Sequence, residues 1–268
     1  MYSVTAVLCC RCAQAGKHIL VEKSFTLNTA EAESTIEVLR IHKVFCMEAQ
    51  MYRCHPLMAR LTALINEQHL GKMLSIQASF NAQIIDLFNR VAGGAILDLG
   101  CYPISLMRLV AGEPISMTGE AELVPSSREG DSVFDRCSSA KVQLPDDVTA
   151  DICACNDAAH CWAFTMVFEQ GSVDVTDLWL DDIPDALLIR RNRSDTTEET
   201  IKAPLPEDKN FYTMQIDVVN RHILQGDLQA AAPAMDWEDS RLNMRALDMW
   251  RRAVGLVYPA DGNHSAPV

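Results

Sequence analysis

Residues 16–24 read GKHILVEKS, a stretch in which the run from His18 to Val21 leads into Glu22 and Lys23. A short, largely apolar run between a glycine and charged residues is typical of a buried strand. In open α/β sheets, ligands bind outside the carboxyl ends of the strands. We therefore expect Lys23 to lie at a ligand-binding edge, although a lysine at a strand end is more often simply solvated.

The residues before this stretch, MYSVTAVLCCRCAQ, carry an apolar run from Val4 to Cys10. A secretory signal peptide would place charged residues before such a run, whereas here Arg11 follows it. We interpret the run as a buried strand, or part of one.

A helix and a second strand follow the opening stretch. Thr29–His42 has helical spacing of its apolar residues, with Asn28 as N-cap and Glu31 completing a capping box. Residues 44–47 form a short apolar run, which indicates a strand. Strand, helix and strand in this order make a βαβ unit, so the two strands should be parallel with a right-handed crossover.

The rest of the chain changes character about halfway along. Residues 56–68 predict a helix and residues 72–80 a strand, and a Gly-Gly pair at 93–94 begins a new unit that ends at Gly112. Short strand-like runs separated by turn residues follow at 141–144, 148–155, 162–168 and 172–178. Strands without intervening helices indicate an antiparallel sheet. Residues 210–225 and 237–254 predict two closing helices.

Composition excludes several classes of partner. The 268 residues carry a net charge of −13, with 49% apolar and 22% charged residues. Nucleic-acid binding and anionic membrane surfaces both require surplus positive charge, so neither partner is expected. No apolar run approaches the length of a membrane span.

The ten cysteines are scattered through the chain. This pattern favours reduced thiols that pack as small hydrophobic groups, and with them a cytoplasmic location. Cys153, Cys155 and Cys161 with His160 suggest a zinc site, but they lack the paired short gaps of closed zinc sites. We therefore expect no metal.

The segment GGAILDLGCYP at 93–103 holds two further candidate residues, Asp98 and Tyr102. They are four apart and share a face if the segment is helical. Pro103 favours a broken turn at Gly100 with a regular helix from about Pro103 to Ala111. From spacing alone, a capping aspartate and a core tyrosine are the better interpretation.

A third segment, MYRCHP at 51–56, follows the second strand. Arg53 and His55 could bind a polar substrate or a cofactor. The alternative is an ordinary helix-entry loop with Pro56 in the first turn.

Together, these segments resemble the Gfo/Idh/MocA (glucose–fructose oxidoreductase / inositol dehydrogenase) family of NAD(P)-dependent enzymes, and within it the dihydrodiol and xylose dehydrogenases. Glu22-Lys23-Ser24 is similar to the family's Glu-Lys-Pro, residues 49–56 to its AxMYRxHP segment, and residues 93–102 to its GGALLDLGxY segment. The similarity extends from about Cys12 to about Val257.

The resemblance implies an α/β remnant of a Rossmann domain plus an α+β domain with a large, mainly antiparallel open sheet. On this basis residues 1–52 are the C-terminal part of a truncated Rossmann domain. Residues 53–258 are a domain for substrate binding and oligomerisation, and residues 259–268 are a flexible tail. The family's open sheet often mediates assembly, so a homo-oligomer through the sheet is expected.

The resemblance also implies the site residues and the chemistry. Hydride would pass between NAD or NADP and a CH–OH carbon of a sugar, polyol or dihydrodiol. The catalytic residues would be Lys23, Asp98 and Tyr102. Lys23 could take the hydroxyl proton if burial and a nearby cation lower its pKa from about 10.4 towards 7–8, whereas Asp98 would raise it.

The binding residues follow from the same comparison. Glu22, Lys23 and Arg53 would bind the cofactor, and Tyr52 and His55 the substrate.

Two features depart from the family pattern. Ser24 replaces the proline that fixes the backbone after the lysine. The sequence contains no G-x-G-x-x-G and no acidic ribose-binding residue after a strand before Lys23, the features that hold the pyrophosphate and ribose. Three hypotheses follow: a dehydrogenase recorded in truncated form, a non-catalytic sugar-binding or oligomer-scaffold descendant, or an unstable fragment with no activity.

Overall fold

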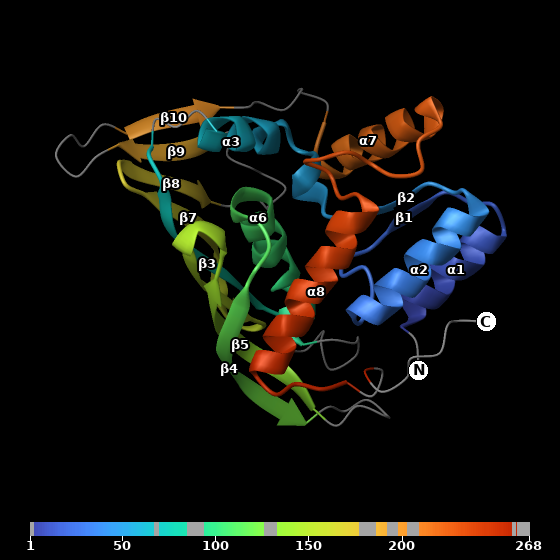
Figure 1. Ribbon diagram of the computed structural model, residues 1–268, viewed down its shortest axis with the longest axis horizontal. Helices are drawn as coiled ribbons and strands as arrows, with labels where there is room; N and C mark the ends of the chain where they lie inside the picture. Colours follow the sequence, from blue (N-terminus) through green and yellow to red (C-terminus); the bar gives the residue numbers. More distant parts are fainter. Residues whose placement is uncertain are drawn as a thin grey trace.

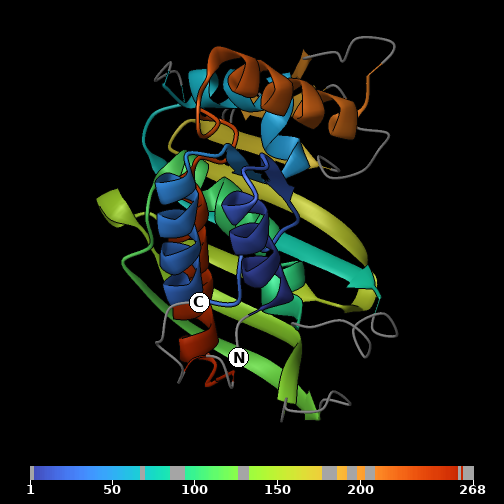
Figure 2. The same ribbon diagram turned by 90° about the vertical axis from the view of Figure 1, so that its right-hand side faces the viewer.

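The computed structural model describes residues 3–66, 70–84, 94–125, 133–176, 186–191, 198–202, 209–258 and 261. Figures 1 and 2 show one broad sheet, a long helix packed on it, and a smaller layer of helices and two strands beyond that helix. Most of the tail expected at 259–268, together with Gly93, lies outside the described residues.

The N-terminal run is a helix, so the expectation of a strand there was wrong. Helix α1 (Val4–Gln14) begins at Ser3, whose hydroxyl accepts a hydrogen bond from the amide of Ala6 at 3.0 Å. The buried residues of this helix are spaced three and four apart, which is the stripe of a helix and not the alternation of a strand. They are Ala6, Cys9, Cys10 and Ala13.

The predicted βαβ unit is confirmed. Strands β1 (Ile19–Val21) and β2 (Cys46–Glu48) pair in parallel on either side of helix α2 (Thr29–His42). Asn28 caps α2 by accepting from the amide of Glu31 at 2.9 Å. The Glu31 carboxylate accepts from the amides of Ser3 and Leu27, and so does not complete the expected capping box.

The large sheet has eight described strands, in the order β10-β9-β8-β7-β3-β6-β5-β4. Their pairings are antiparallel except for the parallel pair β3–β6. This agrees with the expected large, mainly antiparallel sheet. The strands are β3 (Met73–Gln83), β4 (Ser116–Pro125), β5 (Val133–Gln143), β6 (Thr149–Cys155), β7 (Asp157–Phe168), β8 (Gly171–Thr176), β9 (Ala186–Arg191) and β10 (Glu198–Lys202).

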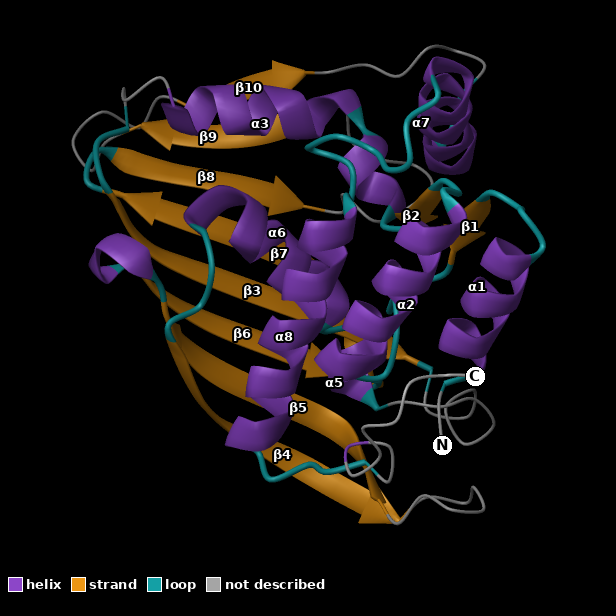
Figure 3. Cartoon of the chain, turned by 45° about the vertical axis from the view of Figure 1, so that its right-hand side comes forward, coloured by secondary structure: helices purple, strands orange, loops and turns teal. Residues whose placement is uncertain are grey.

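Helices cover one face of this sheet (Figure 3). Helix α8 (Trp237–Ala253) lies between α2 and the sheet, and its Trp250 is fully buried. The hydrophobic residues on both sides of residue 52 belong to one cluster, and the domain boundary there remains a prediction. The remaining helices are η1 (Met51–Cys54), α3 (Pro56–Asn66), α5 (Ala95–Asp98), α6 (Cys101–Ala111), η2 (Pro145–Asp147) and α7 (Phe211–Gln225).

One pair of cysteines departs from the expectation of reduced thiols. Cys137 on β5 and Cys155 on β6 face each other across the antiparallel pair, and they are joined by a disulfide. The other eight cysteines are free. Among the described residues, no three metal-ligating side chains are grouped to hold an ion, and no helix is long and apolar enough to cross a membrane.

Candidate active site

Lys23 lies two residues beyond the end of β1, and its side chain turns inward. It is 14% exposed, and its Nζ donates to both the carbonyl oxygen and the Oδ1 atom of Asp98, at 2.7 and 2.6 Å. The neighbouring Ser24 donates its hydroxyl to the carbonyl of Leu97 at 2.6 Å. Both contacts tie the chain after β1 to the short helix α5.

Asp98 and Tyr102 stand on either side of the predicted break. Asp98 ends α5, and Tyr102 is the second residue of α6. A Cβ atom at Gly100 would lie 2.6 Å from the carbonyl oxygen of Ile96 and 2.8 Å from the Trp250 ring, so only glycine fits the break. The Lys23 ammonium lies 5.0 Å from the centroid of the Tyr102 ring. The structure thus brings Lys23, Asp98 and Tyr102 together from segments 75 residues apart.

Aromatic rings extend from Tyr102 along the helix-covered face of the sheet. Tyr102 stacks on Phe80 of β3 with centroids 4.8 Å apart, and Phe80 stacks on Trp162 of β7 at 5.0 Å. The exposed His160 contacts the Trp162 ring at 4.2 Å. This row of rings forms an apolar wall beside the lysine.

The charge on Lys23 is set by its neighbours. Burial by itself lowers the pKa of the ammonium, but Cys101, Tyr102 and Asp98 raise it by more, so its pKa lies above the ordinary value. Burial raises the pKa of the Cys101 thiol to about 12, and it also raises the pKa of Tyr102. Both groups are therefore neutral near pH 7, and the ion-pair partner of Lys23 is Asp98. The lowered lysine pKa suggested by the sequence is not what the structure shows.

The guanidinium of Arg53 forms its hydrogen bonds with other groups inside the protein, so we do not assign Arg53 to the cluster of Lys23, Asp98 and Tyr102. It is 1% exposed and donates to the carbonyl of Pro233, to Ser105 of α6 and to Asp239 of α8. These contacts tie η1 to two helices. Cofactor binding by Arg53 remains an untested prediction, which this geometry does not support.

The other three predicted residues are placed differently from one another. Tyr52 is buried and donates a hydrogen bond from its hydroxyl to the carbonyl of Tyr102 at 3.3 Å, so it helps to hold the backbone of Tyr102 in place. The buried His55 accepts from the amide of Leu57 and packs against Phe211, away from Lys23. Glu22 is exposed at the end of β1.

Two buried carboxylates near the site were missed in the sequence. Glu48 ends β2 and accepts from the amide of Phe25 at 3.1 Å, just after Lys23, and burial raises the pKa of Glu48 to about 7. Asp135 of β5 accepts from the amide of Ile96 in α5 at 2.7 Å. A signal for Glu48 was present, since it ends a strand parallel to β1 and therefore lies at the same sheet edge as Glu22.

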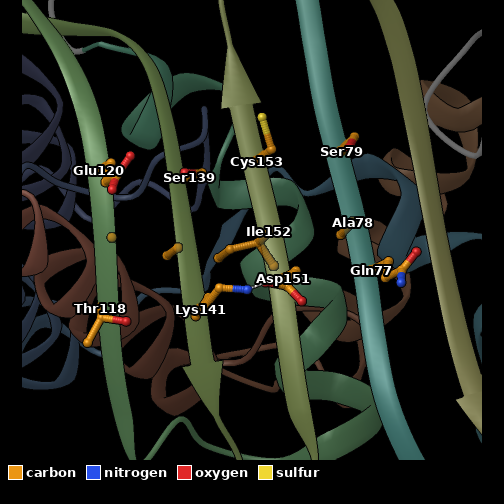
Figure 4. Close-up of a pocket in the computed structure, with 12 residues that line it drawn as sticks. Gln77, Ala78, Ser79, Thr118, Glu120, Ser139, Lys141, Asp151, Ile152 and Cys153 are labelled. Atoms are coloured by element: carbon orange, nitrogen blue, oxygen red, sulfur yellow. Dashed lines mark hydrogen bonds and ion pairs between the residues drawn. The ribbon is translucent and has the colours of Figure 1, made fainter.

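The open face of the large sheet carries a separate hollow of about 590 Å³ (Figure 4). It crosses β4, β5, β6 and β3, and an ion pair between Lys141 and Asp151 spans two of these strands at 2.6 Å. None of the predicted site residues lines it. Its lining residues include Gln77, Ser79, Thr118, Glu120, Ser139, Lys141, Asp151 and Cys153.

Known proteins match this chain along most of its length. Residues 58–174 match the GFO/IDH/MocA C-terminal domain. The trans-1,2-dihydrobenzene-1,2-diol dehydrogenase of Xenopus tropicalis is 27% identical over 256 residues, which span 92% of this chain and 74% of the relative. The D-xylose 1-dehydrogenase (NADP(+)) 2 of Haloferax volcanii is 25% identical over 243 residues, spanning 88% of this chain and 70% of the relative.

Solved structures share the fold. The aldose-aldose oxidoreductase from Caulobacter crescentus, complexed with glycerol, superposes with a TM-score of 0.80 at 20% identity. The match covers 97% of this chain and 75% of the other. The levoglucosan dehydrogenase in complex with NADH and L-sorbose superposes with a TM-score of 0.76 at 17% identity.

Proposed function

Because this chain belongs to the GFO/IDH/MocA family, whose C-terminal domain it carries at residues 58–174, we propose that it is an NAD(P)-dependent oxidoreductase. Its reaction transfers a hydride between a nicotinamide and a CH–OH carbon of a sugar, polyol or dihydrodiol. The similar proteins named as dihydrodiol and xylose dehydrogenases support this substrate class.

The observation that carries the proposal is the cluster of Lys23, Asp98 and Tyr102. A buried ammonium held at 2.6 Å by a carboxylate and beside a phenol is a proton-transfer group at the carboxyl end of a parallel strand. The nicotinamide, when bound, gives or accepts the hydride.

Each side chain has a separate task in this proposal. Lys23 is an ammonium near neutral pH, so it donates a proton to the substrate oxygen when a carbonyl is reduced. Tyr102 shares that oxygen through its hydroxyl and relays the proton. Asp98 keeps Lys23 charged and oriented through two hydrogen bonds. In the oxidation direction, Lys23 must first lose its proton.

The residues present fit only one end of the cofactor. Lys23 and the adjacent Glu22 would face the nicotinamide, because they follow β1 and Lys23 lies beside Tyr102. The 268 residues contain no G-x-G-x-x-G loop to hold the pyrophosphate. Our proposal therefore includes a nucleotide-binding segment in a longer form of this protein, and sequencing the transcript upstream of the Met1 codon tests it.

The wall of rings supports a cyclic substrate. Aromatic faces stack on the apolar faces of other rings and exclude water from them. The exposed edge of this wall, at Trp162 and His160, leads from the surface to Tyr102. The open sheet face, with its hollow, is proposed as the contact between copies in a homo-oligomer.

The test compares turnover of the longest natural form with its Lys23→Met variant. NADP or NAD is supplied with D-xylose or with trans-dihydrobenzenediol, and cofactor binding is followed by nicotinamide fluorescence. We expect Lys23→Met to lower kcat by about 10²–10⁴-fold with cofactor binding retained, since this is the usual contribution of a proton-transfer group. Lys17→Met, at an exposed lysine, is the control. Equal kcat values for the two variants would refute the proposal.

The second candidate is the non-catalytic sugar-binding or oligomer-scaffold protein that the sequence leaves open. Binding of a polyol in the absence of nicotinamide, unchanged by Lys23→Ala, would support this candidate.

A further inference from the structure

Asp135 is a buried carboxylate that reaches from the sheet to the helix carrying Asp98. It lies on β5, is fully buried, and its Oδ2 accepts from the amide of Ile96 at 2.7 Å. Ile96 is the second residue of α5, and Gly94, the residue that precedes the helix, has no side chain to cap it. The Asp135 side chain therefore caps the N-terminus of α5, although Asp135 belongs to β5.

The position of Gly94 shows how close this approach is. A Cβ atom there would lie 1.8 Å from Oδ1 of Asp135 and 2.5 Å from its backbone oxygen. Any other residue would displace Asp135 or the start of α5. The close approach of Asp135 thus explains why position 94 is a glycine.

Helix α5 is only four residues long, so what holds its start also sets its end. Its last residue is Asp98, whose carbonyl and carboxylate oxygens hold the Lys23 ammonium. The hydrogen bond from Ser24 to Leu97 joins the same helix to the chain beside Lys23. A continuous set of contacts therefore runs from Asp135 through Ile96 to Asp98 and Lys23.

We propose that Asp135 is a positioning residue of the active site, which holds α5 so that Asp98 meets Lys23. This inference rests on the proposed function for its consequence in catalysis, but the geometry that it describes does not require a cofactor. Asp135 itself touches neither Lys23 nor the space beside Tyr102.

The surroundings of Asp135 suit a carboxylate that acts by accepting hydrogen bonds. Burial raises the pKa of Asp135 to about 7, while the amide of Ile96 and the guanidinium of Arg251 on α8 oppose that rise. Its Oδ1 has no hydrogen-bond partner among the described residues. An asparagine can occupy the same volume and still accept from Ile96 through its amide oxygen.

The experiment measures the ionisation of Lys23 without cofactor or substrate. The full chain is acetylated briefly with acetic anhydride across a pH series, and mass spectrometry gives the rate for each lysine. Exposed Lys17 and Lys43 are internal references. Amide hydrogen exchange of the peptide that contains Ile96–Asp98 is measured on the same samples.

Three variants are compared with the wild type. In Asp135→Ala we expect exchange of this peptide to quicken about tenfold or more, since the hydrogen bond that Asp135 accepts from the Ile96 amide is lost. We also expect the pKa of Lys23 to fall by about one unit or more, because burial lowers it and the carboxylate of Asp98 opposes that effect less once it moves away. In Asp135→Asn both quantities should stay close to the wild type. Asp236→Ala is the matched control, since this carboxylate caps a different helix, α8, by accepting from the amide of Asp239.

Each outcome decides the question. If folded Asp135→Ala keeps the wild-type exchange and Lys23 ionisation, or if Asp236→Ala changes both equally, Asp135 has no positioning role. If Asp135→Ala does not fold, the test rests on Asp135→Asn. The proposal then requires that Asp135→Asn keeps both the wild-type amide exchange and the wild-type ionisation of Lys23, and a change in either overturns it. If the ionisation responds as expected but the longest form of the protein never turns over, the positioning role holds and the proposed function fails.

Discussion

At the scale of single residues, the decisive pair is Lys23 and Asp98. Their side chains are 14% and 32% exposed, so the ammonium is partly withdrawn from water while its carboxylate partner is more accessible. A buried charge is costly unless it is paired and hydrogen-bonded, and the two contacts to Asp98 supply both conditions. The pair therefore preserves the charge on Lys23.

That charge predicts a pH dependence. Because the pKa of Lys23 is raised, the amine is almost entirely protonated between pH 7 and 9, and the rate of carbonyl reduction should be flat there. Alcohol oxidation needs the neutral amine, so its rate should rise about tenfold per pH unit over the same range. Initial rates of both directions, measured on the longest form of the protein, check this prediction.

Asp98→Asn supplies the matched change for the same measurement. Removing the carboxylate charge leaves burial to lower the pKa of Lys23, so the oxidation profile should move to lower pH. Glu37→Gln, an exposed change on α2, should leave the profile in place. A rate of oxidation that does not vary with pH in the wild type would exclude Lys23 as the proton-transfer group.

At the scale of elements, the break between α5 and α6 sets the distance between Asp98 and Tyr102. One uninterrupted helix would place both residues on a single face, but α5 ends at Asp98, and Gly100, which precedes α6, lies close to the Trp250 ring. Helix α8 therefore packs directly against the break. The geometry of the site depends on packing between elements that are far apart in sequence.

Gly100→Ala tests this packing. The backbone at Gly100 has φ −65° and suits any residue, so the cost should come from contact alone. We expect the free energy of unfolding to fall by about 1–3 kcal/mol from overpacking, and kcat to fall as Asp98 and Tyr102 move apart. Urea denaturation and initial rates give the two quantities.

Gly226→Ala is the matched control for Gly100→Ala. A Cβ atom there meets nothing within 4 Å, but φ is +80°, so only backbone strain of about 1 kcal/mol is expected. Its kcat should match the wild type. If Gly100→Ala also leaves kcat unchanged, the break does not set the site.

At the scale of the whole molecule, α8 joins the two-stranded layer to the large sheet. It packs against α2 on one side and against α6 and β4 on the other (Figures 1 and 3). The opposite face of the sheet carries no helix among the described residues. Its hollow crosses β3, β6, β5 and β4 at one end of the sheet and is lined by polar side chains such as those of Ser79 and Lys141. That open face leads to the prediction about assembly.

Ser79→Arg places a long cation in the middle of the open face, beside the hollow. If copies of the chain meet there, like charges from two copies should weaken the assembly, and its mass in size-exclusion chromatography with light scattering should fall to that of one chain. Glu37→Arg, on α2, should not change the mass. Wild-type protein that already runs as a single chain would contradict the proposal of a homo-oligomer.

Much of the fold follows from local patterns. The βαβ unit, the cap at Asn28 and the run of antiparallel strands all follow from spacing and turn residues, because those preferences act over a few neighbours. The run from Val4 to Cys10 was mistaken for a strand because an unbroken apolar stretch suits either element. The residues of this run that are buried lie three and four apart, and that spacing depends on the packing of α1 against α2, which only the structure shows.

The sequence by itself determined which elements form and which residues are candidates for chemistry, because strand runs, caps and the three motifs are local or depend on family resemblance. The tertiary structure alone decided that Lys23 meets Asp98, that its pKa rises and not falls, and that Asp135 holds α5. Those results depend on burial and on distances between segments tens of residues apart. Charge interactions weaken with distance and strengthen with burial, and neither can be read from residue order.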